Sequence, residues 1–293
     1  MPRSMAGLLH GGPRPTDAIV EETARLRHHA DMPSCRILTP TLLDRPVPGL
    51  DAVAGRGGWT LNAPALPDAD EMTRTGAVLT ALADMVEGAV RTGLRPIALG
   101  GDCCQPIAVM AGLTRAGIRP LLLWLDAHGD FNTHATTISG FVGGMPLAML
   151  TGRGRLDLLR AVGLEPMPDR DVVLSDARNL DPREAELLAA SAVTRVASID
   201  EAIAILPADR PVYVHIDVDV VDGAELQQTH YPEPGGPSAA DVSRALAHLR
   251  DTRDVVAASM TAWSPALDAD GRTADYCLGL LDTLTAPRAA RSA

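Results

Sequence analysis

The sequence is poor in aromatic residues, in basic clusters and in long apolar runs, and each shortage excludes a class of protein. Only 3% of its 293 residues are Phe, Trp or Tyr, so Ala, Leu and Val must fill the core. The net charge of -11 and the lack of a basic patch argue against a nucleic-acid or anionic-membrane partner. No apolar run approaches the ~20 residues that a membrane helix needs. We therefore expect a globular protein with neither kind of partner.

Cysteine is also scarce, and the few thiols fall in different contexts. Residues 1–15 lack the apolar centre of a signal peptide, which predicts a cytoplasmic protein whose thiols stay reduced. Neighbours Cys103 and Cys104 can hardly form a relaxed disulfide with each other. Cys35 and Cys277 lie in apolar stretches and are predicted to be small core residues.

Apolar runs typical of strands alternate with helical patterns along the chain. Strands are predicted at residues 36–39, 95–99, 121–125, 171–175, 193–197, 211–217 and 255–261. Helices are predicted at residues 16–29, 71–92, 105–116, 146–151, 156–162, 182–190, 199–205, 238–250 and 274–284, and the Gly- and Pro-rich residues 46–70 as loop. This alternation predicts an α/β, three-layer sandwich, with a mostly parallel sheet covered by helices on both faces. Residues 1–293 are expected to form one domain, with a loose start over residues 1–33 and a tail over residues 286–293.

Two carboxylates and an imidazole directly follow one of the predicted strands. Residues 121–125 form an apolar run typical of a buried parallel strand, and Asp126, His128 and Asp130 come next. Strand ends are where an open α/β sheet presents its binding residues, and alternate positions share one side if the backbone stays extended. This set of oxygen and nitrogen ligands suits a divalent first-row metal such as Mn²⁺.

A second acid cluster repeats the pattern after the strand at residues 211–217. Asp217 and Asp219 would share a face, and carboxylates this close repel each other unless a cation lies between them. Either cluster alone could be a pair of solvated loop acids. Two such clusters at the ends of apolar strands indicate a two-metal site instead.

These segments resemble the motifs of the arginase (ureohydrolase) family. Residues 126–133, DAHGDFNT, resemble the family's DAHxDxN, and residues 215–222, HIDVDVVD, resemble its SxDxDxxD. Residues 100–103, GGDC, resemble its GGDH, and the landmarks follow the family's order over residues 95–268. The resemblance implies the family's arginase-like fold and the hydrolysis of a carbon–nitrogen bond by a hydroxide held between two Mn²⁺ ions per chain.

The same resemblance implies which residues hold the ions. One ion would be bound by Cys103, Asp126, Asp130 and Asp217. The other would be bound by Asp126, His128, Asp217 and Asp219, so that Asp126 and Asp217 bridge the pair. In this scheme Asp126, Asp130 and Asp217 are the catalytic residues.

A further stretch resembles the part of arginases that binds the α-amino acid. Asn132, Thr137 and Ser139 match the order NTxxTTxSG and would bind the α-carboxylate. Residues 177–184 resemble the family's RDVDPGE, whose acids hold the α-ammonium, and this gives that role to Asp181 and Glu184. The alternative is that Asp181 is an ordinary helix N-cap before Pro182. The pattern implies an α-amino acid as the small-molecule substrate.

Three departures from the family pattern bear on which amino acid is bound. Cys103 stands at the first metal-binding histidine, and a thiolate adds negative charge that lowers the Lewis acidity of its metal. Gly143 falls at the proton-shuttling histidine, and Ala262 at the glutamate that pairs with the guanidinium. Arginine is always protonated and needs that carboxylate, whereas an N-hydroxyguanidine is far less basic and can bind neutral.

This combination resembles the Nω-hydroxy-L-arginine amidinohydrolases of D-cycloserine biosynthesis, a branch of the family. It implies conversion of Nω-hydroxy-L-arginine to hydroxyurea and L-ornithine, with hydroxyurea entering an antibiotic pathway. Two alternatives stay open: a hydrolase of arginine or of another guanidino or formimidoyl amino acid, and a non-catalytic homologue that binds metal or amino acid. A monomer is favoured over the trimer that arginases often form, because the chain ends soon after its last predicted helix.

Overall fold

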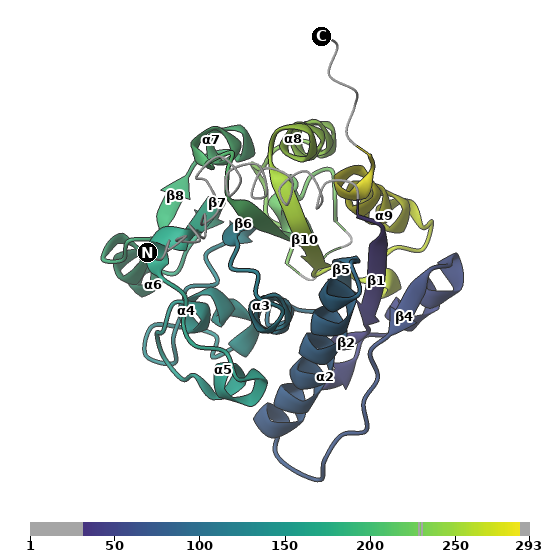
Figure 1. Ribbon diagram of the computed structural model, residues 1–293. Coiled ribbons are helices and arrows are strands. Elements are labelled where there is room, and N and C mark those ends of the chain that lie inside the picture. Colours follow the sequence, from purple (N-terminus) through teal and green to yellow (C-terminus); the bar gives the residue numbers. More distant parts are fainter. Residues whose placement is uncertain (1–31, 228, 230, 288–293) are drawn as a thin grey trace, which may run out of the picture.

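An eight-stranded sheet forms the centre of the molecule (Figure 1). The computed structural model describes residues 32–227, 229 and 231–287. The strands are β1 Ser34–Thr39, β4 Trp59–Leu61, β5 Arg95–Gly100, β6 Leu121–His128, β7 Val172–Asn179, β8 Thr194–Val196, β9 Pro211–Asp217 and β10 Asp254–Thr261. They lie in the order β4-β1-β5-β10-β9-β6-β7-β8, and every neighbouring pair is parallel. A two-stranded antiparallel pair, β2 Thr41–Leu42 and β3 Arg45–Pro46, follows β1.

Helices cover the sheet on both sides, which confirms the predicted three-layer α/β fold and its single domain (Figure 1). One side carries α2 Glu71–Arg91, α3 Gln105–Arg115, α4 Pro146–Leu150 and α5 Asp157–Val162, and the other carries α7 Ile199–Ile205, α8 Ala239–Thr252 and α9 Arg272–Thr285. The helix α6 Pro182–Ala189 follows β7 near the β8 edge of the sheet. Five short 3-10 turns complete the described elements: Leu50–Arg56, Val142–Gly144, Asp169–Asp171, Val218–Val220 and Pro265–Leu267.

Local sequence explains where the main helices begin and how closely they pack. Asp70 accepts a hydrogen bond from the Thr73 amide and starts α2, and Ser238 caps α8 by accepting one from Asp241, as the sequence predicts for Ser238. Helix α3 approaches α2 closely because Gly112 has no side chain there. A Cβ at Gly112 would lie 2.6 Å from the carbonyl oxygen of Ala83.

The predicted loop over residues 46–70 is wrong in part, since it contains the turn Leu50–Arg56 and strand β4. Strand β4 is three residues long and lies at the edge of the sheet, too short for apolar alternation to reveal it. Strand β7 continues beyond the predicted end at residue 175 to Asn179. The predicted helix at residues 16–29 lies outside the described residues, as do most of the predicted loose start and tail.

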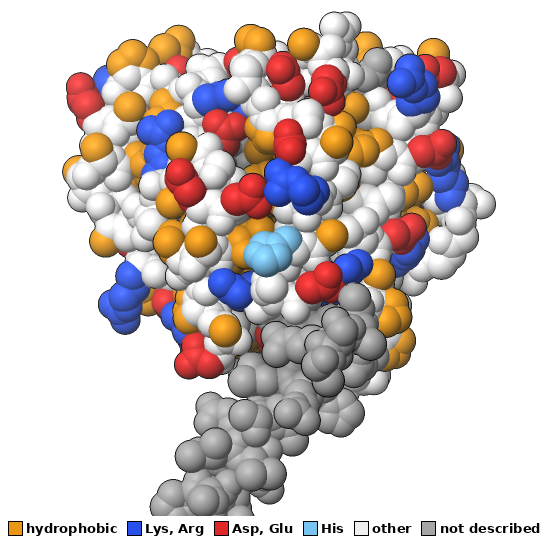
Figure 2. All heavy atoms as spheres, turned by 90° about the horizontal axis from the view of Figure 1, so that it is seen from above, with side chains coloured by type: hydrophobic (Ala, Val, Ile, Leu, Met, Phe, Trp, Pro, Cys, Tyr) orange, Lys and Arg blue, Asp and Glu red, His pale blue; other side chains and the backbone are white. Residues whose placement is uncertain are grey.

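The strand order places a binding site at the middle of the sheet. Strands β5 and β6 follow each other along the chain, yet β10 and β9 lie between them. Open α/β sheets bind ligands at such a switch point, beyond the carboxyl ends of the strands. On the face shown in Figure 2, acidic and basic side chains are interspersed without a broad patch of either sign. Across the described stretches, no helix combines the length and apolarity needed to cross a bilayer.

Candidate metal centre and substrate pocket

A cavity of about 570 Å³ opens beyond the carboxyl ends of β5, β6, β9 and β10. Its lining includes nearly all the residues that the sequence singled out. Those present are Cys103, His128, Asp130, Asn132, Ser139, Asp181, Glu184, Asp217 and Asp219, together with Gly143 and Ala262. Asp126 is buried at the end of β6 beside them, whereas Thr137 is not part of the lining.

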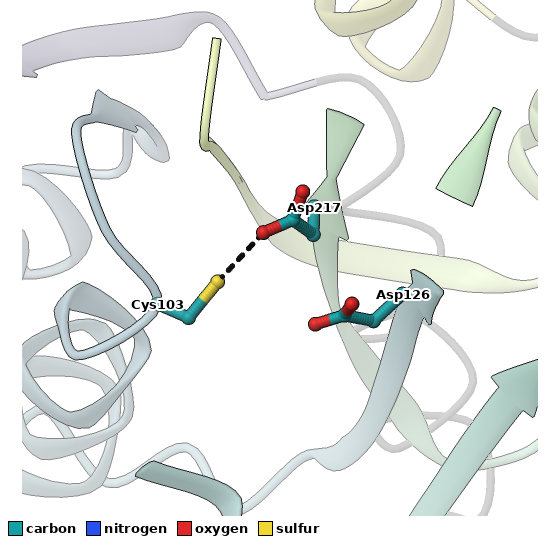
Figure 3. Close-up of side chains that lie close together, drawn as sticks. All are labelled: Cys103, Asp126 and Asp217. Atoms are coloured by element: carbon teal, nitrogen blue, oxygen red, sulfur yellow. Dashed lines mark hydrogen bonds between the residues drawn. The ribbon is translucent and has the colours of Figure 1, made fainter. Parts of the chain in front are cut away.

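Cys103 enters the site from the turn between β5 and α3. Its Sγ lies 3.0 Å from Oδ2 of Asp217 and 3.0 Å from Oγ1 of Thr261. Figure 3 shows Cys103, Asp126 and Asp217 pointing toward one another from three separate segments. Their ligand atoms lie within 4.8 Å of one another, close enough to bind one metal ion.

Asp102 fixes the conformation of that turn. Its buried carboxylate accepts hydrogen bonds from the amides of Leu43, at 2.6 Å, and Cys104, at 2.8 Å. The Sγ of Cys104 lies 3.9 Å from the carbonyl oxygen of Val142 and is not part of the cavity lining. The two neighbouring thiols therefore face different surroundings, and of the two only Cys103 lines the cavity.

A second group of ligand atoms lies beside the first. Nδ1 of His128 is 3.0 Å from Oδ2 of Asp219 and 3.5 Å from Oδ1 of Asp126, and the three residues can hold a second ion. Trp124 orients the carboxylate of Asp126, because the indole Nε1 donates to Oδ2 of Asp126 at 3.0 Å. Burial lowers the pKa of His128, but its contacts with Asp126 and Asp219 outweigh this and raise the pKa to about 12.

Asp130 reaches the site in a way that the sequence did not predict. Strand β6 ends at His128, and Asp130 has a left-handed backbone with φ of 47°, so the expectation of an extended chain through residue 130 is wrong. Its carbonyl oxygen accepts from the amides of Leu147, at 2.9 Å, and Ala148, at 3.2 Å, which fixes the conformation to the start of α4. Asp217 and Asp219 likewise span a strand end and a 3-10 turn, not one extended face.

The buried acids repel one another, and this favours a cation between them. Burial, followed by the charge of Asp126, raises the pKa of Asp130, and burial with the charge of Asp219 raises those of Asp126 and Asp217. Burial and Asp217 also raise the pKa of the Cys103 thiol. Oδ2 of Asp130 is buried without a hydrogen-bond partner among the described residues. A divalent ion would satisfy this oxygen and reverse the repulsion, so the residues fit a metal pair.

The predicted substrate residues meet at one end of the cavity. The Nδ2 of Asn132 donates to Oδ2 of Asp181 at 3.1 Å, which joins two segments far apart in sequence. Glu184 is buried, and its carboxylate accepts from the amides of Phe131, at 2.8 Å, and Asp181, at 3.1 Å. Asp181 is also the N-cap of α6, as the capping alternative predicted, and its substrate-binding role stays a prediction. Thr137 accepts from the Gly140 amide at 3.0 Å and shapes the loop.

Three residues of the lining carry no charged or polar side chain, and we call Phe141, Gly143 and Ala262 the wall. A Cβ on Gly143 would overlap the ring of Phe141, so that ring fills the space beside the glycine. Ala262 is 6% exposed and has a left-handed backbone with φ of 68° at the end of β10. We call Cys103, Asp126, His128, Asp130, Asp217 and Asp219 the floor.

Sequence reasoning missed several residues around the floor. Glu233 and Tyr231, from the loop after β9, line the cavity, and so does Asn179 at the end of β7. No apolar run or family motif includes Tyr231 or Glu233, so only the acid type of Glu233 could have drawn attention to it. His215 on β9 is fully buried, and burial lowers its pKa to about 3. It hydrogen-bonds Ser259 at 2.9 Å and stays neutral.

Comparisons with known proteins agree with this geometry. The model of the arginase family matches residues 26–286. The arginase of Bacillus caldovelox is 30% identical over 218 residues, which cover 69% of this chain and 72% of that protein. The arginase of Bacillus subtilis (strain 168) is 27% identical over 280 residues, 90% of this chain and 94% of its own. The solved arginase from Bacillus cereus superposes with a TM-score of 0.76 at 26% identity, covering 87% of this chain and 99% of that one.

The chain belongs to the arginase family. It is an enzyme of the class that hydrolyses the carbon–nitrogen bonds of amidines. The family match covers both the floor and the wall, so Cys103, Gly143 and Ala262 are features of an arginase-family site.

Proposed function

We propose that the protein hydrolyses Nω-hydroxy-L-arginine to hydroxyurea and L-ornithine. The observation that carries this proposal is the wall: Ala262 and Gly143 present no charged group where the reacting end of the substrate would lie. A protonated guanidinium beside this surface would be desolvated without a carboxylate partner, which costs several kcal/mol. An N-hydroxyguanidine can enter uncharged and avoids that cost.

The reaction balances as a simple hydrolysis. The oxygen of water forms a bond to the guanidino carbon, and the bond from that carbon to the side-chain nitrogen of ornithine breaks. One proton from water goes to that nitrogen, the other goes to the hydroxylated nitrogen, and the carbon leaves as hydroxyurea. Asp130, whose Oδ2 has no hydrogen-bond partner in the described part of the chain, can accept a hydrogen bond from the attacking water.

We assign the floor to two Mn²⁺ ions. Cys103, Asp126, Asp130 and Asp217 would hold one ion, and Asp126, His128, Asp217 and Asp219 the other. When bound, such a pair supplies Lewis-acid activation of water at neutral pH. The protein's part is to keep the six side chains converged by the turn at Asp102, the left-handed residue Asp130 and the Trp124 hydrogen bond.

We assign the opposite end of the cavity to the amino-acid part of the substrate. Asp181 is placed to bind the α-ammonium, and Asn132 and Ser139 the α-carboxylate. Glu184 supports Asp181 by accepting from its amide at 3.1 Å, and we propose that it acts through this contact. Thr137 would act through the backbone of the same loop.

Arginine hydrolysis is the second candidate, and the relatives favour it, because those at 27% and 30% identity are named arginases. The assay is to incubate the Mn²⁺-loaded protein with each amino acid and to measure hydroxyurea, urea and ornithine. Faster release of hydroxyurea supports the proposal. Faster release of urea supports an arginase, and no release from either substrate supports a binding homologue.

We also propose that the enzyme is a cytoplasmic monomer. Sedimentation equilibrium at micromolar concentration should return the mass of one 30.8 kDa chain. A mass of three chains would contradict the proposal.

A further inference from the structure

Glu233 lies beside the metal-ligand candidate His128 on the side away from the acids of the floor. Its Oε1 is 3.5 Å from Nε2 of His128, while Nδ1 of the same ring faces Asp219 and Asp126. The imidazole therefore has its two nitrogens in different surroundings, one toward the metal position and one toward a separate carboxylate. Metal-ligating histidines generally donate their other N–H to such a partner, which fixes the tautomer and the ring orientation.

Asn179 holds Glu233 in this position. Its Nδ2 donates to Oε1 of Glu233 at 2.7 Å. Asn179 is the register partner of His128 where β7 pairs with β6, so both side chains start from adjacent strand ends. The carboxylate is thus fixed by the same pair of strands that presents the histidine.

Arg178 binds the main chain of two segments next to the contact between Glu233 and His128. Its guanidinium donates to the carbonyl oxygens of Glu233, at 2.8 Å, and Pro234, at 3.0 Å, in the loop after β9. It also donates to the carbonyl oxygen of Asp219 at 3.0 Å, and it forms an ion pair with Asp176. One side chain therefore couples the turn that carries a floor acid to the loop that carries Glu233. Because Arg178 binds main-chain oxygens, the loop stays held when the side chain of Glu233 is removed.

We propose that Glu233 is a positioning residue for the second metal ion, acting through His128. It accepts from Nε2–H and leaves Nδ1 unprotonated and directed at the ion, with Asn179 and Arg178 keeping it in place. This inference rests on the proposed two-metal site and adds to it a residue that the ligand pattern does not contain.

The test is Mn²⁺ binding by Glu233→Ala, Glu233→Gln and Asn179→Ala in the full chain. Mn²⁺ is titrated and followed by the electron paramagnetic resonance of free ion and of the coupled pair. Glu233→Ala should weaken binding of the second ion ~10–100-fold and leave binding of the first ion unchanged. Glu233→Gln keeps an oxygen acceptor and should retain most of the affinity, and Asn179→Ala should cause a smaller loss in the same direction. Glu165→Ala, an exposed acid outside the cavity, is the matched control and should match wild type.

The outcomes separate this inference from the proposed function. If wild type binds two ions and both Glu233→Ala and Asn179→Ala bind them equally well, the positioning role is overturned and the metal site stands. If Glu233→Gln loses the ion as fully as Glu233→Ala, Glu233 is itself a ligand and the positioning role is also overturned. If wild type shows no coupled pair at saturating Mn²⁺, the proposed two-metal site fails and this inference fails with it.

Discussion

The floor and the wall of one cavity differ in how they relate to the arginase pattern. The floor keeps five of the six side-chain types that the family motifs imply, with Cys103 as the substitution. The wall keeps neither the imidazole nor the carboxylate, and it presents Gly143, Ala262 and the ring of Phe141 instead. In the proposed function the floor determines which reaction is possible, since it would hold the two metal ions. In the same proposal the wall selects the substrate, since it would set the charge and shape that the guanidino group meets.

The largest effect should come from breaking the floor. In Asp219→Ala, His128 loses its 3.0 Å partner and the second ion loses a ligand. We expect turnover to fall roughly a thousandfold, about 4 kcal/mol in activation free energy. Steady-state kinetics with metal analysis measures this, and circular dichroism should show an intact fold. Asp209→Ala removes an exposed acid outside the cavity and should behave as wild type, whereas unchanged turnover in Asp219→Ala would contradict the ligand role.

Cys103 stands where the family motif has a metal-binding histidine, and variants of Cys103 and its neighbour Cys104 form a matched pair that tests this position. Cys103→Ala should lose one ion and nearly all activity, because its Sγ lies 3.0 Å from Asp217 within the floor. Cys104→Ser should be mild, costing ~1–2 kcal/mol of stability for a buried hydroxyl. Because burial and Asp217 raise the pKa of the Cys103 thiol, alkylation is done at alkaline pH, and mass spectrometry should then find Cys103 protected by Mn²⁺ and reactive without it. The reverse result for the two residues would show that the assignment is off by one position.

Metal should stabilise the folded protein as well as activate it. The crowded carboxylates of Asp126, Asp130 and Asp217 repel one another, and a cation that binds only the folded state adds ~2.7 kcal/mol at a hundredfold excess over Kd. Differential scanning fluorimetry should therefore show a rise in Tm of roughly 5–10 °C with Mn²⁺, reversed by a chelator. A Tm that stays unchanged with Mn²⁺ and with every other divalent ion tested would contradict a metal-binding floor.

Restoring an imidazole to the wall should have the smallest effect on arginine turnover. In Gly143→His, the new side chain would overlap Phe141, which we expect to cost about 1–3 kcal/mol of stability. Arginine hydrolysis should stay low because Ala262 still provides no carboxylate. The double variant Gly143→His with Phe141→Ala relieves the overlap and serves as the control. Strong arginine hydrolysis in Gly143→His alone would show that the wall does not exclude arginine.

The sequence predicted the layers of the fold and the floor because both depend on local patterns. Apolar runs gave five of the seven predicted strands within two residues at each end, and the acids that follow two of the predicted runs lie together in the structure. Family motifs added Cys103, which no apolar pattern distinguishes from Cys104. Strand β4 was not predicted, because its three residues lie between glycine-rich turns and an extended stretch.

The surroundings of the floor could not be predicted, since they arise from contacts between distant segments. Glu233 meets His128 across 105 positions of the chain, where Arg178 binds the main chain of its loop and Asn179 binds its carboxylate. Phe141 fills the space beside Gly143 through a turn at residues 142–144 that no pattern indicates. The left-handed backbones of Asp130 and Ala262 are likewise imposed by the packing around them, not by their residue types.

The most direct test of the contrast between floor and wall is a comparison of two substrates on one enzyme preparation. The Mn²⁺-loaded wild-type protein is given Nω-hydroxy-L-arginine or L-arginine, and ornithine, hydroxyurea and urea are quantified by mass spectrometry. The account predicts hydroxyurea and ornithine in equal amounts from the first substrate, with kcat/KM at least ~100-fold above that for urea release from arginine, a difference of about 2.7 kcal/mol. Equal or faster release of urea from arginine would contradict it.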